Sequence, residues 1–370
     1  MMNPAVLTRI PAALVALLMV LLLSSWFAPE GDSVRIQQID FWLVWLLCML
    51  LLALPMTLLE TALARRSQTA PLQAIVQLTR EADVRPAWRL VGWLAVAVMA
   101  IMAGGMAYQS AYYFKLFDAT VGWSVPLFAW ASLSILVAVG LSWYPRVLIW
   151  AGVIFAILSI ELSTFAQGIG QWAWTSFSLA EWSAAVTLAL VASGLGMGLY
   201  WQSALSQPTS DRASLQALPI WAAQVVGGVL FALAQGIHGG LATTLYALAL
   251  LCGAGYLVSM VRLQLSARGL AVPLQWALLL ASLLIWLLPW SVLWVQIASA
   301  LGLVVCLVYA LFSGWQMKIS HLRKALNFSH EMTYNLWRVA MRLMIPLAVL
   351  LALLGLINQM GQFWFFNNSP

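Results

Sequence analysis

Charged residues are scarce in this chain of 370 residues, where Asp, Glu, Lys and Arg together make up only 8%. A soluble domain usually contains about 25% charged residues, so the composition argues against a soluble globular protein. Hydrophobic residues, by contrast, make up 64% of the sequence. We therefore expect a membrane protein, and the net charge of +6 gives no reason to expect nucleic acid as a partner.

The motifs of nucleotide-driven and hydrolytic enzymes are also missing. The sequence contains no P-loop of the GxxxxGK[ST] type, no GxSxG and no HExxH. Its three cysteines, Cys48, Cys252 and Cys306, lie in apolar segments without CxxC or Cys/His spacing, so neither a disulfide framework nor a metal site is expected. We predict that the protein is not an enzyme and binds no metal or cofactor.

Long apolar segments follow one another along the whole chain. A membrane-spanning helix needs about 20 predominantly apolar residues. Eleven segments have a suitable length, at about 11–28, 41–63, 88–113, 121–143, 147–166, 182–205, 216–236, 240–262, 270–289, 291–314 and 336–357. The sequence therefore predicts an all-α polytopic protein that forms a single membrane domain, residues 1–370, in the lipid bilayer.

The basic residues indicate how the chain crosses the membrane. With the N-terminus in the cytoplasm and eleven crossings, all but two of the 17 basic residues fall on the cytoplasmic side, the exceptions being Arg35 and Lys115. This asymmetry follows the positive-inside rule. We predict a multi-pass protein of a bacterial-type inner membrane, with a cytoplasmic N-terminus and an external C-terminus.

Three alternating glycines, Gly194, Gly196 and Gly198, interrupt the apolar segment 182–205 in the run SGLGMGLYW. Each glycine costs a helix about 1 kcal/mol relative to alanine. The glycines could serve close packing between helices. Alternatively, they could mark a broken helix that lines a cavity, as in transporters whose discontinuous helices bind solute. Glycine spacing alone leaves both interpretations open.

The order of several motifs resembles the neurotransmitter:sodium symporter family. ALPMTLLETALARRSQTAPLQA, residues 53–74, is similar to the end of that family's helix 2 and its first intracellular loop, and WRLVGWL, residues 88–94, is similar to the start of its helix 3. SGLGMGLYWQSAL, from residue 193, is similar to its unwound helix 6. WRVAMRLMIPLAVLLALLGL, residues 337–356, resembles its helix 11. The resemblance covers nearly the whole chain.

This resemblance implies the LeuT-type fold, in which two sets of five helices form inverted repeats. Repeat 1 would cover about residues 8–166, repeat 2 about 182–314 and helix 11 about 336–357. It also implies a secondary transporter of a small, amino-acid-like solute. The residues that we expect to bind solute or line the cavity are Gly194, Gly196, Gly198, Tyr108, Tyr200 and Gln202.

Helix 1 lacks the features with which this family binds sodium. The family has a broken helix 1 with a Gly/Asn-rich stretch, whereas this chain has no glycine between Pro11 and Gly31 and no asparagine in this region after Asn3. A run of Val, Leu and Met provides almost no oxygen ligands, which a hard cation requires. We therefore predict a continuous helix 1, no specific sodium site and no sodium coupling.

Two acidic residues lie within the apolar segments. The resemblance implies that Glu60 braces the unwound part of helix 6, whereas the alternative is that it pairs with Arg65 or Arg66 near the headgroups. Glu161 is expected roughly in the middle of helix 5, hydrogen-bonded to Ser159 or Thr164, where it would be a proton carrier or a contact for a partner. The intramembrane glutamines are expected mainly to bond between helices; they are Gln109, Gln202, Gln224 and Gln235.

Two classes of function remain. The first is a sodium-symporter-like secondary transporter of a small solute without the usual sodium coupling. The second is a non-transporting subunit with the LeuT-type fold that acts as a scaffold or regulator and binds a partner membrane subunit. The retained glycine break and Glu161 favour the first class, and the apolar helix 1 favours the second.

Overall fold

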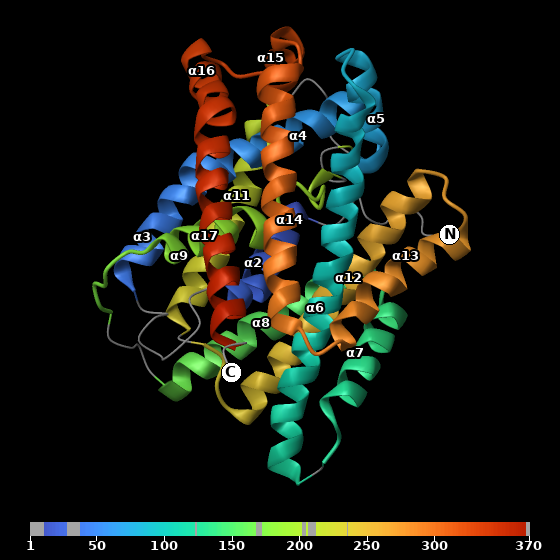
Figure 1. The fold of residues 1–370 in the computed structure, drawn as a ribbon, viewed down its shortest axis with the longest axis vertical. Coiled ribbons are helices and arrows are strands. Elements are labelled where there is room, and N and C mark those ends of the chain that lie inside the picture. The colour runs from blue at the N-terminus through green and yellow to red at the C-terminus, as the bar shows by residue number, and fades with distance from the viewer. Residues whose placement is uncertain are drawn as a thin grey trace.

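The structure is a computed structural model that describes residues 11–27, 38–122, 124–167, 172–201, 205, 212–234 and 236–367. Figure 1 shows a bundle of helices with no sheet among these residues. Seven helical segments are long and apolar enough to cross a membrane: Ile39–Ser67, Pro86–Phe117, Pro145–Phe165, Ser214–Leu233, Gly240–Ala267, Ser291–Gln316 and Glu331–Gly361. Four shorter apolar helices are Ala12–Trp26, Leu127–Leu141, Leu179–Ala192 and Val272–Leu287. Each coincides with a predicted span, so the all-α polytopic prediction is confirmed.

Helix 1, α2, runs without interruption from Ala12 to Phe27. No glycine or proline occurs inside it, so every residue can keep the helical backbone conformation. It packs against α11 (Ser214–Leu233) and α8 (Pro145–Gln167) in the interior of the bundle. The continuous helix 1 predicted from the sequence is therefore present.

Helices 2 and 11 each contain a π-helical segment just before a proline. Helix 2 consists of α3 (Ile39–Cys48), the π-helical residues Met49–Ala53 and α4 (Leu54–Ser67), and helix 11 consists of α16 (Glu331–Val339), the π-helical residues Ala340–Met344 and α17 (Ile345–Asn367). Pro55 and Pro346 have no N–H to donate to the carbonyl four residues earlier. The wider π-helical turn accommodates this missing hydrogen bond without ending the helix.

Helix 3, α6, is longer than its apolar segment and extends from Leu90 to Val121. We predicted a span ending near residue 113, with Lys115 and Asp118 in an outer loop, and this boundary was wrong. No glycine or proline occurs between Met106 and Val121, and the helix ends only at Gly122, where φ is +80°. Helix 4, α7, therefore starts later, at Leu127, and ends at Leu141.

In the second half of the chain, α12 (Gly240–Ala267) packs mainly against α6, α8 and α7 of the first half. Helix 6 begins as α9 (Leu179–Thr187), continues as the π-helical residues Leu188–Ala192 and then unwinds. Two further helices follow, α13 (Val272–Leu284) and α14 (Ser291–Leu311), and α14 lies beside α17 (Figure 1). Short helices α5 (Pro71–Glu81) and α15 (Ile319–Leu326) lie at the predicted cytoplasmic end.

Candidate functional site

In the unwound part of helix 6, every second residue has a left-handed backbone conformation with a positive φ angle. The φ angles of Gly194, Gly196 and Gly198 are +71°, +80° and +74°, whereas Leu195 and Met197 do not have positive φ. Glycine adopts this left-handed conformation without the steric cost that a Cβ atom brings. Alternation of this kind turns successive N–H groups toward one side, which makes a concave site for an anion.

The side chain of Glu60 occupies this concave site. Glu60 is 3% exposed, and its Oε1 accepts a hydrogen bond from the N–H of Gly196. The backbone of Gly198 also donates toward the same carboxylate. Arg66, one of the two alternative partners, forms an ion pair with Glu81 instead, at 2.7 Å. The geometry therefore places backbone donors of the unwound segment against this buried carboxyl group, and the brace is a role that a substitution can test.

The carbonyl groups freed by the break have protein partners. Tyr200 and Gln224 both donate to the carbonyl of Ser193, and Gln264 Nε2 lies 3.1 Å from the carbonyl oxygen of Met197. Just after the break, Trp201 Nε1 donates to the carbonyl of Thr69, between α4 and α5, at 2.9 Å. These carbonyls are thus already hydrogen-bonded by side chains of the chain itself. Tyr200, which we expected to face solute, instead turns its hydroxyl back onto the break.

The interior between α2, α6 and α12 is filled by apolar side chains. Leu22 and Met106 are completely buried. A Cβ atom on Gly253 of α12 would lie 2.5 Å from Leu22 Cδ1 and 3.0 Å from Met106 Sδ, so the glycine makes room for both. Among the described residues, no group of three His, Cys, Asp or Glu side chains could hold a metal ion. Around Leu22 and Met106 this region is thus packed with apolar side chains.

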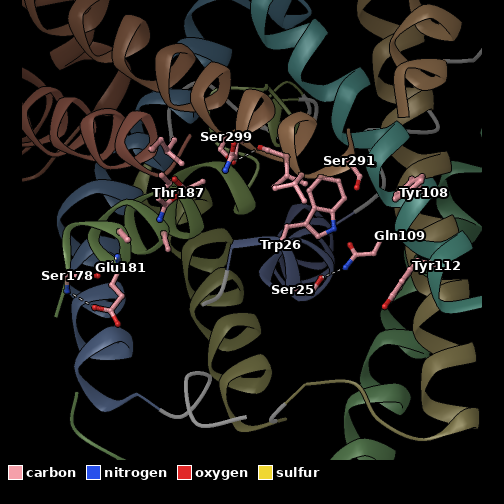
Figure 2. Close-up of a pocket in the computed structure, with 18 of the residues that line it drawn as sticks. Ser25, Trp26, Tyr108, Gln109, Tyr112, Ser178, Glu181, Thr187, Ser291 and Ser299 are labelled. Atoms are coloured by element: carbon pink, nitrogen blue, oxygen red, sulfur yellow. Dashed lines mark hydrogen bonds between the residues drawn. The ribbon is translucent and has the colours of Figure 1, made fainter. Parts of the chain in front are cut away.

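A cavity of about 780 Å³ lies between α2, α6, α9, α14 and α17. Figure 2 shows Trp26 between Thr187 and Ser299 on one side and Tyr108 and Gln109 on the other. Of the residues predicted to line a cavity, Tyr108 does so. Gly194, Gly196, Gly198 and Tyr200 do not line it, and Gln202 lies outside the described residues.

Aromatic rings form part of the cavity wall next to helix 3. The ring centroids of Trp26 and Trp286 are 5.5 Å apart, and those of Tyr108 and Trp286 are 5.9 Å apart. A Cβ atom on Gly105 would overlap Trp26 Cη2, so this glycine allows the indole to pack against α6. In the sequence, the adjacent Gly104 and Gly105 indicate close packing at this point, but they do not show which side chain packs against them.

Several polar atoms of the cavity wall have no hydrogen-bond partner within the described part of the chain. They are Gln38 Oε1, Gln109 Oε1 and Thr187 Oγ1. Gln109 Nε2 does bond between helices, as predicted, because it donates to Ser25 Oγ at 3.1 Å. No Lys, Arg or His occurs among the described lining residues, and the acidic Glu181 already accepts from the N–H of Ser178 at 2.6 Å. The described wall thus offers a solute polar side chains but no cation for a carboxylate.

Glu161 is not in the environment that we predicted. It lies six residues before the end of α8, Gln167, and its side chain is exposed on the outside of the bundle. The neighbouring hydroxyl groups bond to the backbone instead: Ser159 to the carbonyl of Ala242 at 2.7 Å and Thr164 to that of Ile160 at 2.9 Å. Glu161 thus lies past the middle of the helix, toward its end at Gln167, rather than in the middle as expected, and the rotation of α8 that turns it outward could not be read from the sequence.

A charged cluster that sequence reasoning missed connects α4, α5 and α15. Arg66 Nη2 lies 2.7 Å from Glu81 Oε2 and 2.9 Å from His321 Nδ1. Burial alone would raise the pKa of Glu81, but hydrogen bonds from Gln77 and Arg66 lower it below its usual range. The pKa of His321 is lowered by partial burial and by the positive charges of Arg66 and Lys318. The cluster is therefore built around a neutral His321 that accepts a hydrogen bond from Arg66.

Acidification should weaken this cluster. Both Glu81 and His321 have lowered pKa values in the folded state, so the unfolded chain binds more protons and folding stability falls as the pH falls. The loss from His321 should begin below about pH 6.5 and that from Glu81 below about pH 4.3. We expect the melting temperature of the purified protein to decrease between pH 7.5 and 5.5, with a shallower decrease for His321→Gln. An equal decrease in the variant would contradict this role.

Comparison with known proteins supports the fold. No protein-family model matches the sequence, and no curated protein is significantly similar to it. Among solved structures, the crystal structure of MhsT in complex with L-phenylalanine is similar, with a TM-score of 0.70 and 18% sequence identity over 94% of this chain and 98% of MhsT. At this level of identity the similarity concerns the fold alone. The chain is thus a multi-pass membrane protein with the LeuT-type fold, a fold of membrane transporters.

Proposed function

We propose that this protein is a secondary transporter homologue that binds a small solute in the cavity between α2, α6, α9, α14 and α17, without sodium. The observation that carries this proposal is the cavity itself, because about 780 Å³ is within the range of roughly 300–1,000 Å³ that small-molecule sites occupy. Its aromatic wall at Trp26, Trp286 and Tyr108 suits the apolar part of a solute. The polar residues of the lining, among them Ser25, Gln109 and Ser291, suit the polar groups of a solute.

The absence of sodium coupling rests on helix 1. The continuous α2 keeps its carbonyl groups in helical hydrogen bonds, and Leu21, Leu22 and Leu23 supply no oxygen from their side chains. Tyr246 of α12 also places its hydroxyl 3.0 Å from the carbonyl oxygen of Leu21. A hard cation therefore has no set of free oxygens along this helix.

Two probes of similar shape test the proposal. L-Phenylalanine is the molecule bound in the MhsT structure, and 2-phenylethylamine has the same ring and amine but no carboxylate. Because no basic side chain occurs among the described lining residues, we expect the amine to bind more tightly than the amino acid. Binding should be equal in sodium and potassium. Uptake into proteoliposomes should show the same independence of sodium.

Variants of the cavity wall test whether the probes bind in this cavity rather than elsewhere on the protein. Ser291→Ala removes a hydroxyl group that lines the cavity, so the affinity for the amine should fall about two- to tenfold. Ser282→Ala is the matched control, since Ser282 is not in the cavity lining and its hydroxyl donates to the carbonyl of Leu278 at 3.0 Å. Equal loss in both variants, sodium-dependent binding, or no binding of either probe would contradict the proposal.

A second function has its own supporting observation. The filled interior at Leu22, Met106 and Gly253 and the hydrogen-bonded break in helix 6 suit a protein that does not open to the cytoplasm. In that case Glu161, on the outside of α8 beside the exposed Leu158 and Leu162, would contact a partner membrane subunit. Solute binding without any uptake, together with loss of a co-purifying subunit in Glu161→Gln, would favour this non-transporting role.

A further inference from the structure

A pair of arginines lies on the outward face of helix 11 near its predicted cytoplasmic end. Arg338 and Arg342 are four residues apart, so they lie on the same side of the helix. Large apolar side chains of the same turns are exposed: Leu336 by 60%, Val339 by 48% and Leu343 by 53%. The arginines thus project from a surface that faces lipid, close to the level of the headgroups.

The π-helical residues Phe312–Gln316, which follow α14, hold Arg342 in place. Arg342 Nε donates to the carbonyl of Gly314 at 2.6 Å, and its guanidinium carbon lies 5.0 Å from the ring centroid of Trp315. A Cβ atom on Gly314 would lie 3.0 Å from Arg342 Cγ, so the glycine allows the arginine to lie against the backbone. One edge of the guanidinium is thereby fixed, and its remaining N–H groups have no protein acceptor within the described residues.

The charge around this pair is strongly positive. Residues 315–345 contain one acid, Glu331, and it pairs with Arg323 at 3.3 Å. No acidic side chain forms an ion pair with Arg338 or Arg342 in the part of the chain that the structure describes. Trp315, which is 58% exposed, has the position of an interfacial aromatic residue. Figure 1 shows the upper ends of α14 and α16 close together, with α15 beside them.

We propose that Arg338, Arg342 and Trp315 form a binding site for the phosphate headgroup of an anionic phospholipid in the cytoplasmic leaflet. Guanidinium groups bind phosphate through two parallel N–H···O bonds. Basic side chains beside membrane helices at the cytoplasmic surface are a known means of binding anionic headgroups. The exposed Leu336, Val339 and Leu343 would contact the acyl chains of the same lipid. This site is separate from the solute cavity and does not depend on the proposed transport.

The test compares lipids and two matched double variants of the full-length protein in detergent. Dioleoylphosphatidylglycerol should raise the melting temperature of the wild type, whereas dioleoylphosphatidylcholine should not. In Arg338→Gln/Arg342→Gln the apparent affinity for phosphatidylglycerol should fall about thirtyfold, at about 1 kcal/mol for each basic side chain. Arg80→Gln/Arg85→Gln removes the same charge from exposed residues elsewhere at the predicted cytoplasmic end and should keep the wild-type response.

Two further measurements separate binding of the lipid from binding of free phosphate and from a loss of stability in a variant. Inorganic phosphate at millimolar concentration should not reproduce the stabilisation, because it lacks the acyl chains; if it does, the site binds free phosphate and the lipid proposal is overturned. Native mass spectrometry counts bound phosphatidylglycerol even if a variant is less stable. Equal lipid retention by the two double variants would also overturn the proposal.

Discussion

Replacing Gly198 with alanine should lower the melting temperature of the protein more than the same change at a left-handed glycine with open space around it. A Cβ atom at this position would overlap Pro71 Cγ and lie 2.7 Å from Pro71 Cβ, and the φ angle is +74°. The proline ring is tied to the backbone of α5, so it cannot rotate away. The left-handed conformation costs alanine about 1–2 kcal/mol, and overpacking adds about 1–3 kcal/mol.

A matched control separates these two costs. Gly269 has nearly the same angle, +78°, but no heavy atom lies within 4 Å of the position that a Cβ atom would occupy. Gly269→Ala should therefore show only the backbone cost of about 1–2 kcal/mol. Thermal unfolding of both variants, followed by tryptophan fluorescence in the same detergent, makes the comparison. Equal melting temperatures would mean that Gly198 does not make close contact with α5.

The broken helix and the continuous helix were both predictable because each depends on local sequence. Glycine adopts a left-handed backbone readily, so the glycines at 194, 196 and 198 permit an unwound segment, and the resemblance to the symporter family's helix 6 favoured it over close packing. Helix 1 has no such residue between Pro11 and Gly31, and it stays helical from Ala12 to Phe27. The span positions were predictable for a similar reason, since hydrocarbon thickness sets the length of each apolar segment.

The location of empty space could not be predicted in this way. Whether Leu22 and Met106 fill the interior depends on the contacts that α2, α6 and α12 make with one another, and no single segment encodes those contacts. The cavity residues Trp26 and Thr187 come from segments far apart in the chain. Trp26 stands at the end of an apolar segment, which is the usual position of tryptophan in membrane proteins, so the sequence does not mark it as a cavity residue.

The outward position of Glu161 has a different explanation. A helix in a membrane does not show the pattern of apolar and polar faces that a soluble helix shows, because the lipid side is apolar as well. In α8, exposed Ile154 and Leu158 and buried Val153 and Ile160 are similar residues, so composition does not indicate which face is inside. The direction of the Glu161 side chain therefore required the packed structure.

Replacing Glu60 with glutamine should also destabilise the protein, because the carboxylate lies against backbone donors. Oε1 accepts from the N–H of Gly196, and the backbone of Gly198 donates to the same group. Glutamine keeps an acceptor oxygen but lacks the negative charge that strengthens the hydrogen bonds from these N–H groups. A hydrogen bond to a charged group contributes about 1.5–3 kcal/mol, so the loss should be of that size.

The effect of Glu60→Gln is best judged against Glu81→Gln, which removes the same charge from a partly exposed ion pair. The pair of Glu81 with Arg66 has side chains exposed by 32% and 22%, and pairs of this kind contribute only about 0–1 kcal/mol. We expect a clearly larger decrease in melting temperature for Glu60→Gln than for Glu81→Gln. If Glu60→Gln unfolds at the wild-type temperature, then Glu60 does not brace the break. The glycine turn would in that case depend on its carbonyl partners Tyr200, Gln224 and Gln264.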